Sequence, residues 1–93
     1  MPNFGSGRLT MITSQSALST ANVQVIAADP ARQFVEVKNM DAAISVYIGP
    51  DSALTTANGY LLKAGESFAL DRYNGAIFAI AASGTPNMST VQW

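Results

Sequence analysis

The side chains that most often carry out catalysis are scarce in this sequence. Its 93 residues contain no histidine and no cysteine. Nucleophilic sites of the Ser-His-Asp and Cys-His types therefore cannot be assembled from it. A histidine-based metal centre is excluded for the same reason.

Carboxylates are the remaining acid–base candidates: Asp29, Glu36, Asp41, Asp51, Glu66 and Asp71. Two carboxylates at a defined separation are enough for glycoside hydrolysis. Most of these acids fall at predicted turns, however, where Asp serves the backbone. The sequence has no Asp-x-Asp-x-Asp run for calcium, and its glycines lie in predicted hairpin turns instead of phosphate-binding loops. We therefore expect no enzyme and no cofactor, and glycosidase activity is the least favoured alternative.

The charge distribution favours a protein partner. Charged residues make up only 12% of the chain, about half the usual share, and the net charge is -1. The basic residues are scattered singly, whereas binding of nucleic acid needs a cluster of them. Neutral Ser, Thr, Asn and Gln take the place of charge, which suits a surface that becomes buried against another protein. A chain of this length forms one domain, and association would add buried area to its small core.

The sequence gives no sign of a membrane or of export. No window approaches the roughly 20 apolar residues of a membrane span, and the first ten residues lack the apolar run of a signal peptide. The lack of cysteine fits a protein made in a reducing cytoplasm.

Short β-strands recur along the chain. The alternation is clearest for Val35 and Val37, and again for Ile44, Val46 and Ile48. Strands are predicted at residues 8–13, 23–28, 33–40, 44–49, 60–62, 68–70, 76–82 and 87–93. Eight short strands at intervals of about 8–12 residues predict an all-β, antiparallel β-sandwich that is jelly-roll-like.

Turn residues between these strands predict three hairpins. The central one spans residues 59–70, with Gly65 available for a positive φ in its turn. The other two span residues 33–49 and 76–93. Residues 14–22 are predicted to form a loop or a weak helical turn, and residues 52–58 a polar loop.

Residues 1–20 are predicted to form a flexible N-terminal arm, and residues 21–93 the β-sandwich domain. Two interpretations of the arm remain open: a disordered terminus, or an arm that orders against a neighbour with Phe4 as its anchor. Arg32 precedes a strand, and at most a weakly stabilising surface ion pair is expected from it.

Aromatic side chains could line a sugar-binding groove, although packing in the core and across strands is their commoner use. They are Tyr47, Tyr60, Phe68, Tyr73, Phe78 and Trp93. Tyr73, which lies in a turn beside Arg72, is expected to be the exposed one. Trp93 either closes the core, which is slightly favoured, or caps an interface.

Four segments, taken in order, carry a resemblance: residues 30–39 (PARQFVEVKN), 46–49 (VYIG), 58–66 (NGYLLKAGE) and 75–80 (GAIFAI). This order resembles small β-sandwich virion proteins of tailed bacteriophages. In those proteins an arginine-led strand, a Val-Tyr-Ile-Gly strand and a Leu-x-Ala-Gly-Glu hairpin follow one another. The resemblance covers about residues 28–93 and brings no catalytic residues with it.

The resemblance implies a capsid decoration (cement) protein. Such a protein binds the major capsid protein on the outer surface of the virion, often as a homo-oligomer, with a trimer favoured, and it is made in the host cytoplasm. The alternative is a receptor-binding or fibre module that grips a host glycan or protein through a concave aromatic patch around Tyr47, Tyr60 and Tyr73. The candidate interface residues are Phe4, Arg8, Leu9, Met11, Arg72 and Tyr73.

Overall fold

The structure is a computed structural model that describes residues 11–93. Within these residues it contains eight β-strands and no helix. The strands are β1 (Ile12–Ala17), β2 (Val23–Ile26), β3 (Phe34–Asn39), β4 (Val46–Gly49), β5 (Tyr60–Leu62), β6 (Ser67–Asp71), β7 (Ile77–Ala81) and β8 (Asn87–Gln92).

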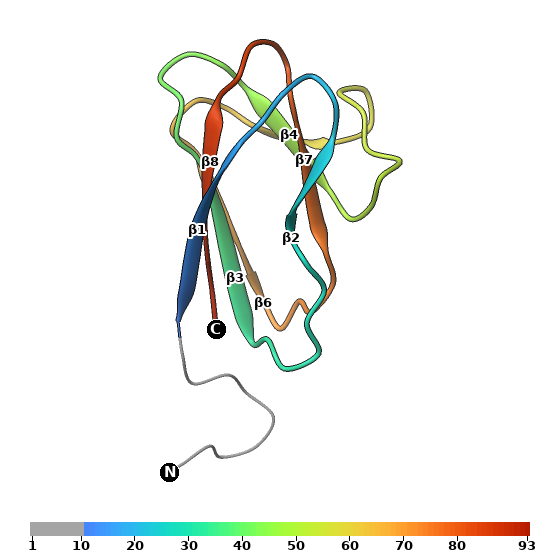
Figure 1. The fold of residues 1–93 in the computed structure, drawn as a ribbon, viewed down its shortest axis with the longest axis vertical. Helices are drawn as coiled ribbons and strands as arrows, with labels where there is room; N and C mark the ends of the chain where they lie inside the picture. The colour runs from blue at the N-terminus through green and yellow to red at the C-terminus, as the bar shows by residue number, and fades with distance from the viewer. Residues whose placement is uncertain (1–10) are drawn as a thin grey trace.

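The strands form two four-stranded sheets in which every pair is antiparallel. Sheet A has the order β1-β8-β3-β6, and sheet B has the order β2-β7-β4-β5. Figure 1 shows the strands running along the long axis of the molecule, with β8 (red) beside β1 (blue) and β3 (green). This is the strand order of a jelly roll. The prediction of an antiparallel β-sandwich of this type is confirmed.

The three predicted hairpins are wrong, although their strands exist. β3 and β4 lie in different sheets, and the same holds for β5 and β6 and for β7 and β8. Each of these connections therefore crosses between the sheets. Gly65 has the positive φ expected of it, at 79°. A tight turn of this kind can join two strands of the same sheet or two strands of different sheets. The turn residues alone therefore do not determine which strand pairs with which.

The core lies between the two sheets and is built by alternate residues. Val35 and Val37 of β3 are buried, as are Val46 and Ile48 of β4, so the predicted alternation is confirmed at these four positions. Ile44, which was predicted to share their strand and face, precedes β4 and is only half-buried. The same buried cluster contains Leu18, Ile26, Leu62, Ile77, Ala79, Ala81 and Met88. Burying each of the larger aliphatic side chains stabilises the fold by about 1.5–3 kcal/mol.

β2 departs from the predicted alternation at a bulge. A regular strand over residues 23–28 would place Val23, Val25 and Ala27 on one face and Gln24 and Ile26 on the other. The register with β7 shifts between Gln24 and Ile26. As a result Ile26 is buried in the core, and Val25 is half-buried beside it. A bulge of this kind inserts one residue and changes the face on which the following side chains lie.

β1 occupies part of the chain that was assigned to the N-terminal arm. Residues 14–17 continue a strand where a loop or helical turn was predicted. β1 pairs with β8 in an unbroken register from Ile12 opposite Gln92 to Ala17 opposite Asn87. The sandwich therefore begins before residue 21. The small polar residues of this segment give little indication of a strand in the sequence. Its extended conformation is determined by pairing with β8, which is distant along the chain.

The connection between β4 and β5 contains a buried anchor. Residues 52–58 were predicted to be a polar loop, yet Leu54 is only 3% exposed. Its Cδ1 lies so close to Gly49 and Gly59 that a Cβ at those positions would approach it to 2.9 and 2.7 Å. The side-chain amide of Asn22 donates to the carbonyls of Ser52 and Leu54, both at 3.0 Å. The loop is thereby fixed to the sandwich.

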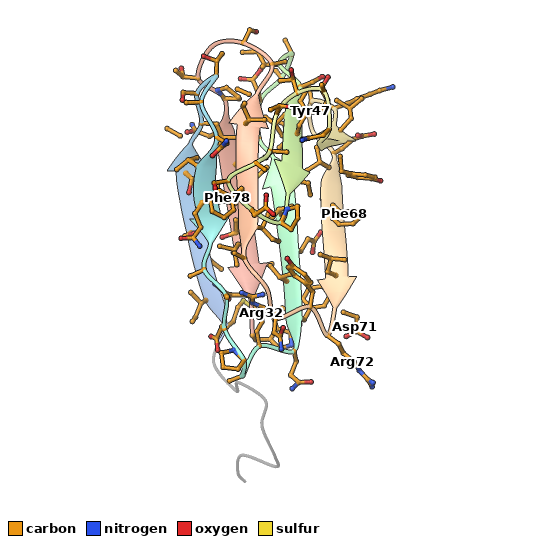
Figure 2. The ribbon with its side chains drawn as sticks, turned by 90° about the vertical axis from the view of Figure 1, so that its right-hand side faces the viewer. Arg32, Tyr47, Phe68, Asp71, Arg72 and Phe78 are labelled. Atoms are coloured by element: carbon orange, nitrogen blue, oxygen red, sulfur yellow. The ribbon has the colours of Figure 1, made fainter. Side chains whose placement is uncertain are left out.

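Arg32 is buried, not a surface residue, with 2% exposure. Its Nε donates to Oε1 of Gln92, and one terminal nitrogen donates to the carbonyls of Tyr73 and Gly75, each at 2.9 Å. The other terminal nitrogen donates to the carbonyl of Ala27. Figure 2 shows Arg32 near the end of the sandwich where β6 finishes at Asp71. This guanidinium therefore ties β8 to two of the connections at that end.

Asn39, at the end of β3, is the second buried polar side chain that joins separate elements. It is 0% exposed. Its Nδ2 donates to the carbonyls of Ile44 (2.8 Å) and Leu62 (3.1 Å), and its Oδ1 accepts from the N–H of Asp41 (3.0 Å). Since a buried amide without partners would destabilise the fold, these bonds are what permit a polar residue in this position.

Candidate functional site

An apolar cleft of about 350 Å³ opens between the sheets at the side where β5 and β6 form the two sheet edges. We call it the β5–β6 cleft. Its lining residues are Ile48, Gly49, Pro50, Asn58, Tyr60, Phe68, Leu70, Tyr73 and Ile77.

The cleft exists because the two edge strands differ in length. β5 has three residues and β6 has five. Phe68 and Leu70 of β6 lie on the inner side of sheet A and are only half-buried. Tyr60 contacts Phe68, with ring centroids 4.8 Å apart, but β5 begins only at Tyr60, and Gly59 before it packs closely against Leu54. The inner side of β6 is therefore left partly uncovered near Leu70.

Two tyrosines shape the cleft in different ways. Tyr60 is 58% exposed and stands at the rim. Tyr73 is half-buried, and its hydroxyl donates to the carbonyl of Ala76 at 2.6 Å. A Cβ on Gly75 would lie 2.6 Å from that hydroxyl, so only glycine allows the ring this position. The ring of Tyr73 is thus held in one position as part of the cleft lining, whereas the ring of Tyr60 is accessible to a partner.

The chemistry of the cleft is that of apolar binding. None of its lining residues is charged. The side-chain amide of Asn58 is already engaged, since Oδ1 accepts from the N–H of Thr55 (2.8 Å) and Nδ2 donates to the carbonyl of Ala53 (3.1 Å). The lining therefore offers shape and apolar surface, which suits an aliphatic or aromatic group of a ligand or partner.

Asp41 is one of four acids whose carboxylates accept hydrogen bonds from backbone N–H groups, the others being Asp29, Asp51 and Glu66. Its carboxylate accepts hydrogen bonds from the N–H groups of Ala43 (2.9 Å) and Ile44 (2.7 Å). These bonds favour the ionised form and lower the pKa of Asp41 below its ordinary value of 3.8. Asp41 does not line the cleft, and its carboxylate stabilises the turn between β3 and β4.

Of the predicted interface residues, those that the structure describes lie at the two opposite edges of sheet A. Phe4, Arg8 and Leu9 lie outside the described residues. Met11 is 61% exposed and precedes β1, at one edge of sheet A. Arg72 and Tyr73 follow β6, at the opposite edge, with β8 and β3 between. Figure 2 shows Arg72 pointing away from the end of β6.

The predicted aromatic patch is corrected in two respects. Tyr60 and Tyr73 share the β5–β6 cleft, but Tyr47 does not line it, because Tyr47 alternates with Val46 and Ile48 and faces away from the core. Tyr73 was expected to be the exposed aromatic residue, and Tyr60 is more exposed than it.

Trp93 does not belong to the core cluster, contrary to the favoured expectation. Its ring stacks on Phe34, with centroids 4.6 Å apart, and it is 36% exposed. It is therefore available on the outer side of sheet A.

Several lining residues, including Ile48, Leu70 and Ile77, could not be identified as site residues from the sequence. Their types are those of ordinary core residues. The sequence held no signal of the cleft, since the two strands that flank it were predicted at equal lengths, over residues 60–62 and 68–70, whereas β6 has five residues.

Within residues 11–93, no group of three or more His, Cys, Asp or Glu side chains could hold a metal ion. The same part of the chain contains no helix long and apolar enough to span a membrane.

No protein-family model matches the chain, and a search of curated proteins found no match. A similar solved structure comes from the pili of Bacillus endospore appendages, described as a novel family of disulfide-linked pili. The alignment covers 100% of this chain and 96% of that chain, with 11% sequence identity and a TM-score of 0.46. At this level the similarity carries no argument about function.

Proposed function

We propose that this protein is a structural virion protein of the capsid decoration type, which binds the outer surface of the major capsid protein lattice and stabilises the head. The observation that carries the proposal is the uncharged, apolar β5–β6 cleft with Tyr60 at its rim. A cleft of this chemistry suits an apolar side chain of a protein partner.

Two further observations support docking onto a larger protein. The chain carries few charges, and large apolar side chains besides Tyr60 are exposed: Met11, Ile12, Val23, Met40 and Trp93. The sequence resemblance to phage virion proteins supplies the kind of partner. Bound copies would stabilise the shell because they bind only the assembled lattice, and each stable contact needs about 800 Å² from each partner.

The location and copy number of the chain in purified virions test this proposal, by cryo-electron microscopy or by a quantitative protein gel. Hundreds of copies over the head are expected. A handful of copies at the tail or at one vertex would contradict decoration.

A test of whether the N-terminal residues bind the capsid requires a deletion that leaves β1 intact. Removing residues 1–20 would also remove β1 and so disrupt sheet A. Deletion of residues 2–10 leaves every described strand in place. If the arm binds the capsid, this deletion lowers the affinity for capsids that lack the protein, and an unchanged affinity would exclude such a role.

A receptor-binding module is the second candidate, and the cleft provides one observation in its favour. Tyr60 and Tyr73 lie together in it, and tyrosine rings stack on the apolar faces of sugars. This candidate predicts binding to purified cell-surface glycans that is lost in Tyr60→Ala. It also predicts few copies of the chain in each particle.

A further inference from the structure

The four edge strands of the sandwich differ in how well they are protected against pairing with another chain. An exposed edge presents unpaired N–H and C=O groups, and proteins normally guard it with short length, bulges, charge or proline. β5 has three residues and is followed by Lys63, and β2 has four residues and a bulge. β6 ends at Asp71, and Arg72 then has a φ of 63°. Three of the four edges are thus guarded.

β1 has none of these features. It is six residues long, and its register with β8 is unbroken. The sequence has no charged residue and no proline from Leu9 to Ala28. Five of the six residues of β1 are exposed. Within residues 11–93, β8 is the strand partner of β1, and the other side of β1 faces no strand.

The backbone of β1 can be assigned residue by residue. The N–H of Leu18 donates to the carbonyl of Pro86 at 2.8 Å, which continues the β1–β8 ladder by one position. In an antiparallel pair, alternate residues bond to the partner strand. The backbone groups of Ile12, Ser14 and Ser16 therefore point toward β8. Those of Thr13, Gln15 and Ala17 point outward from the sheet.

We propose that this outward edge pairs with β1 of a second copy of the chain, so that sheet A continues from one molecule into the next. Around a twofold axis at Gln15, Thr13 faces Ala17 of the second copy and Gln15 faces its own counterpart. The edge is self-complementary, as a twofold interface requires, and the uncharged strand brings no like charges together.

An exposed apolar side chain supports the same register. Ile12 is 42% exposed, although it starts a strand that belongs to the sandwich. In the proposed pairing Ile12 comes opposite Leu18 of the second copy, and the added strand covers part of it. The pairing does not depend on the capsid proposal, and it would stand if the protein had another function.

Sedimentation velocity of the complete chain over a range of concentrations tests the pairing, and a dimer is expected. Gln15→Pro removes the N–H that points outward while the bonds of Ser14 and Ser16 to β8 remain. We expect it to weaken dimerisation at least about tenfold. Gln15→Ala keeps that N–H and is the matched control. A monomer at every concentration would overturn the proposal, as would a cyclic trimer.

Chemical crosslinking tests the register without relying on the fold of the proline variant. The sequence contains no cysteine, so Gln15→Cys introduces a single thiol. Opposed residues in such a pair have Cα atoms about 5.5 Å apart, within reach of a short bismaleimide. The crosslinked dimer is expected in high yield. Ser67→Cys, which is exposed on the opposite edge strand, is the control. Equal yields from the two variants would overturn the proposed register.

Discussion

The side-chain amide of Asn39 in β3 donates a hydrogen bond of 3.1 Å to the carbonyl of Leu62 in β5, and this bond joins sheet A to sheet B. Both residues are buried. Leu62 is the last residue of β5, where the chain leaves sheet B for the crossing to β6. The amide thus provides a hydrogen-bond partner from sheet A for the carbonyl of the residue that ends the β4–β5 ladder.

Asn39→Asp tests this link. At neutral pH the new carboxylate would face the carbonyls of Ile44 and Leu62, to which the amide now donates. We expect the free energy of unfolding to fall by about 3 kcal/mol or more, measured by urea denaturation. Asn87→Asp, at an exposed position of β8, is the control. Similar losses in both variants would mean that Asn39 has no special role.

Arg32→Lys should be destabilising although it keeps the positive charge. A lysine ammonium cannot reach acceptors on three sides as the guanidinium does. We expect a loss of about 2–4 kcal/mol, and each kcal/mol lowers Tm by roughly 4–8 °C in a domain of this size. Arg72→Lys, at an exposed position, should change Tm little. An unchanged Tm in Arg32→Lys would contradict the role assigned to the guanidinium.

Tyr60→Ala should separate binding from folding. Tyr60 is exposed at the rim of the β5–β6 cleft, and its contact with Phe68 contributes only about 0.5–1.5 kcal/mol to stability. If the cleft docks onto the capsid, affinity for capsids that lack the protein should fall at least about tenfold. Leu61→Ala is the control, because Leu61 is on the same strand and faces the other side. Equal effects of the two changes would argue against the cleft.

The contribution of Asp41 should depend on pH in a defined direction. Its pKa is lowered in the folded protein by the N–H groups of Ala43 and Ile44. The stabilisation is therefore fully present above the unfolded pKa, near 3.8, and is lost as the pH falls through the lower folded pKa. In urea denaturation, Asp41→Ala should be less stable than the unchanged chain at pH 7, and the difference should shrink below pH 3.8. Asn58→Ala removes an uncharged turn residue, and its effect should not vary with pH.

The positions of strands β2 to β8 could be predicted because their signal is local. Val35 and Val37 alternate with Glu36 and Lys38, and a half-buried strand follows from that pattern alone. The strand partners could not be predicted in this way. Gly65 produces the same tight turn whether β6 returns to the same sheet or crosses to the other.

The site was harder to predict than the fold. The β5–β6 cleft results from the unequal lengths of two strands that are not paired with each other, and no local motif records such a relationship. Asn39 resembles a turn residue in sequence, and only the approach of Leu62 from the other sheet makes it a buried link. β1 could be misread because its partner β8 lies about 75 positions away along the chain, at the far end of the sequence.

The central place of β8 in sheet A also determines when the protein can fold. β8 lies between β1 and β3, yet it is the last of the eight strands in the sequence. During synthesis β1 therefore cannot pair with β8 until residues 87–92 have left the ribosome. Folding of such a non-local topology is slow, of the order of milliseconds to seconds. Until β8 has emerged and paired with β1, the uncharged β1 strand can pair with other chains, so aggregation competes with folding during that interval.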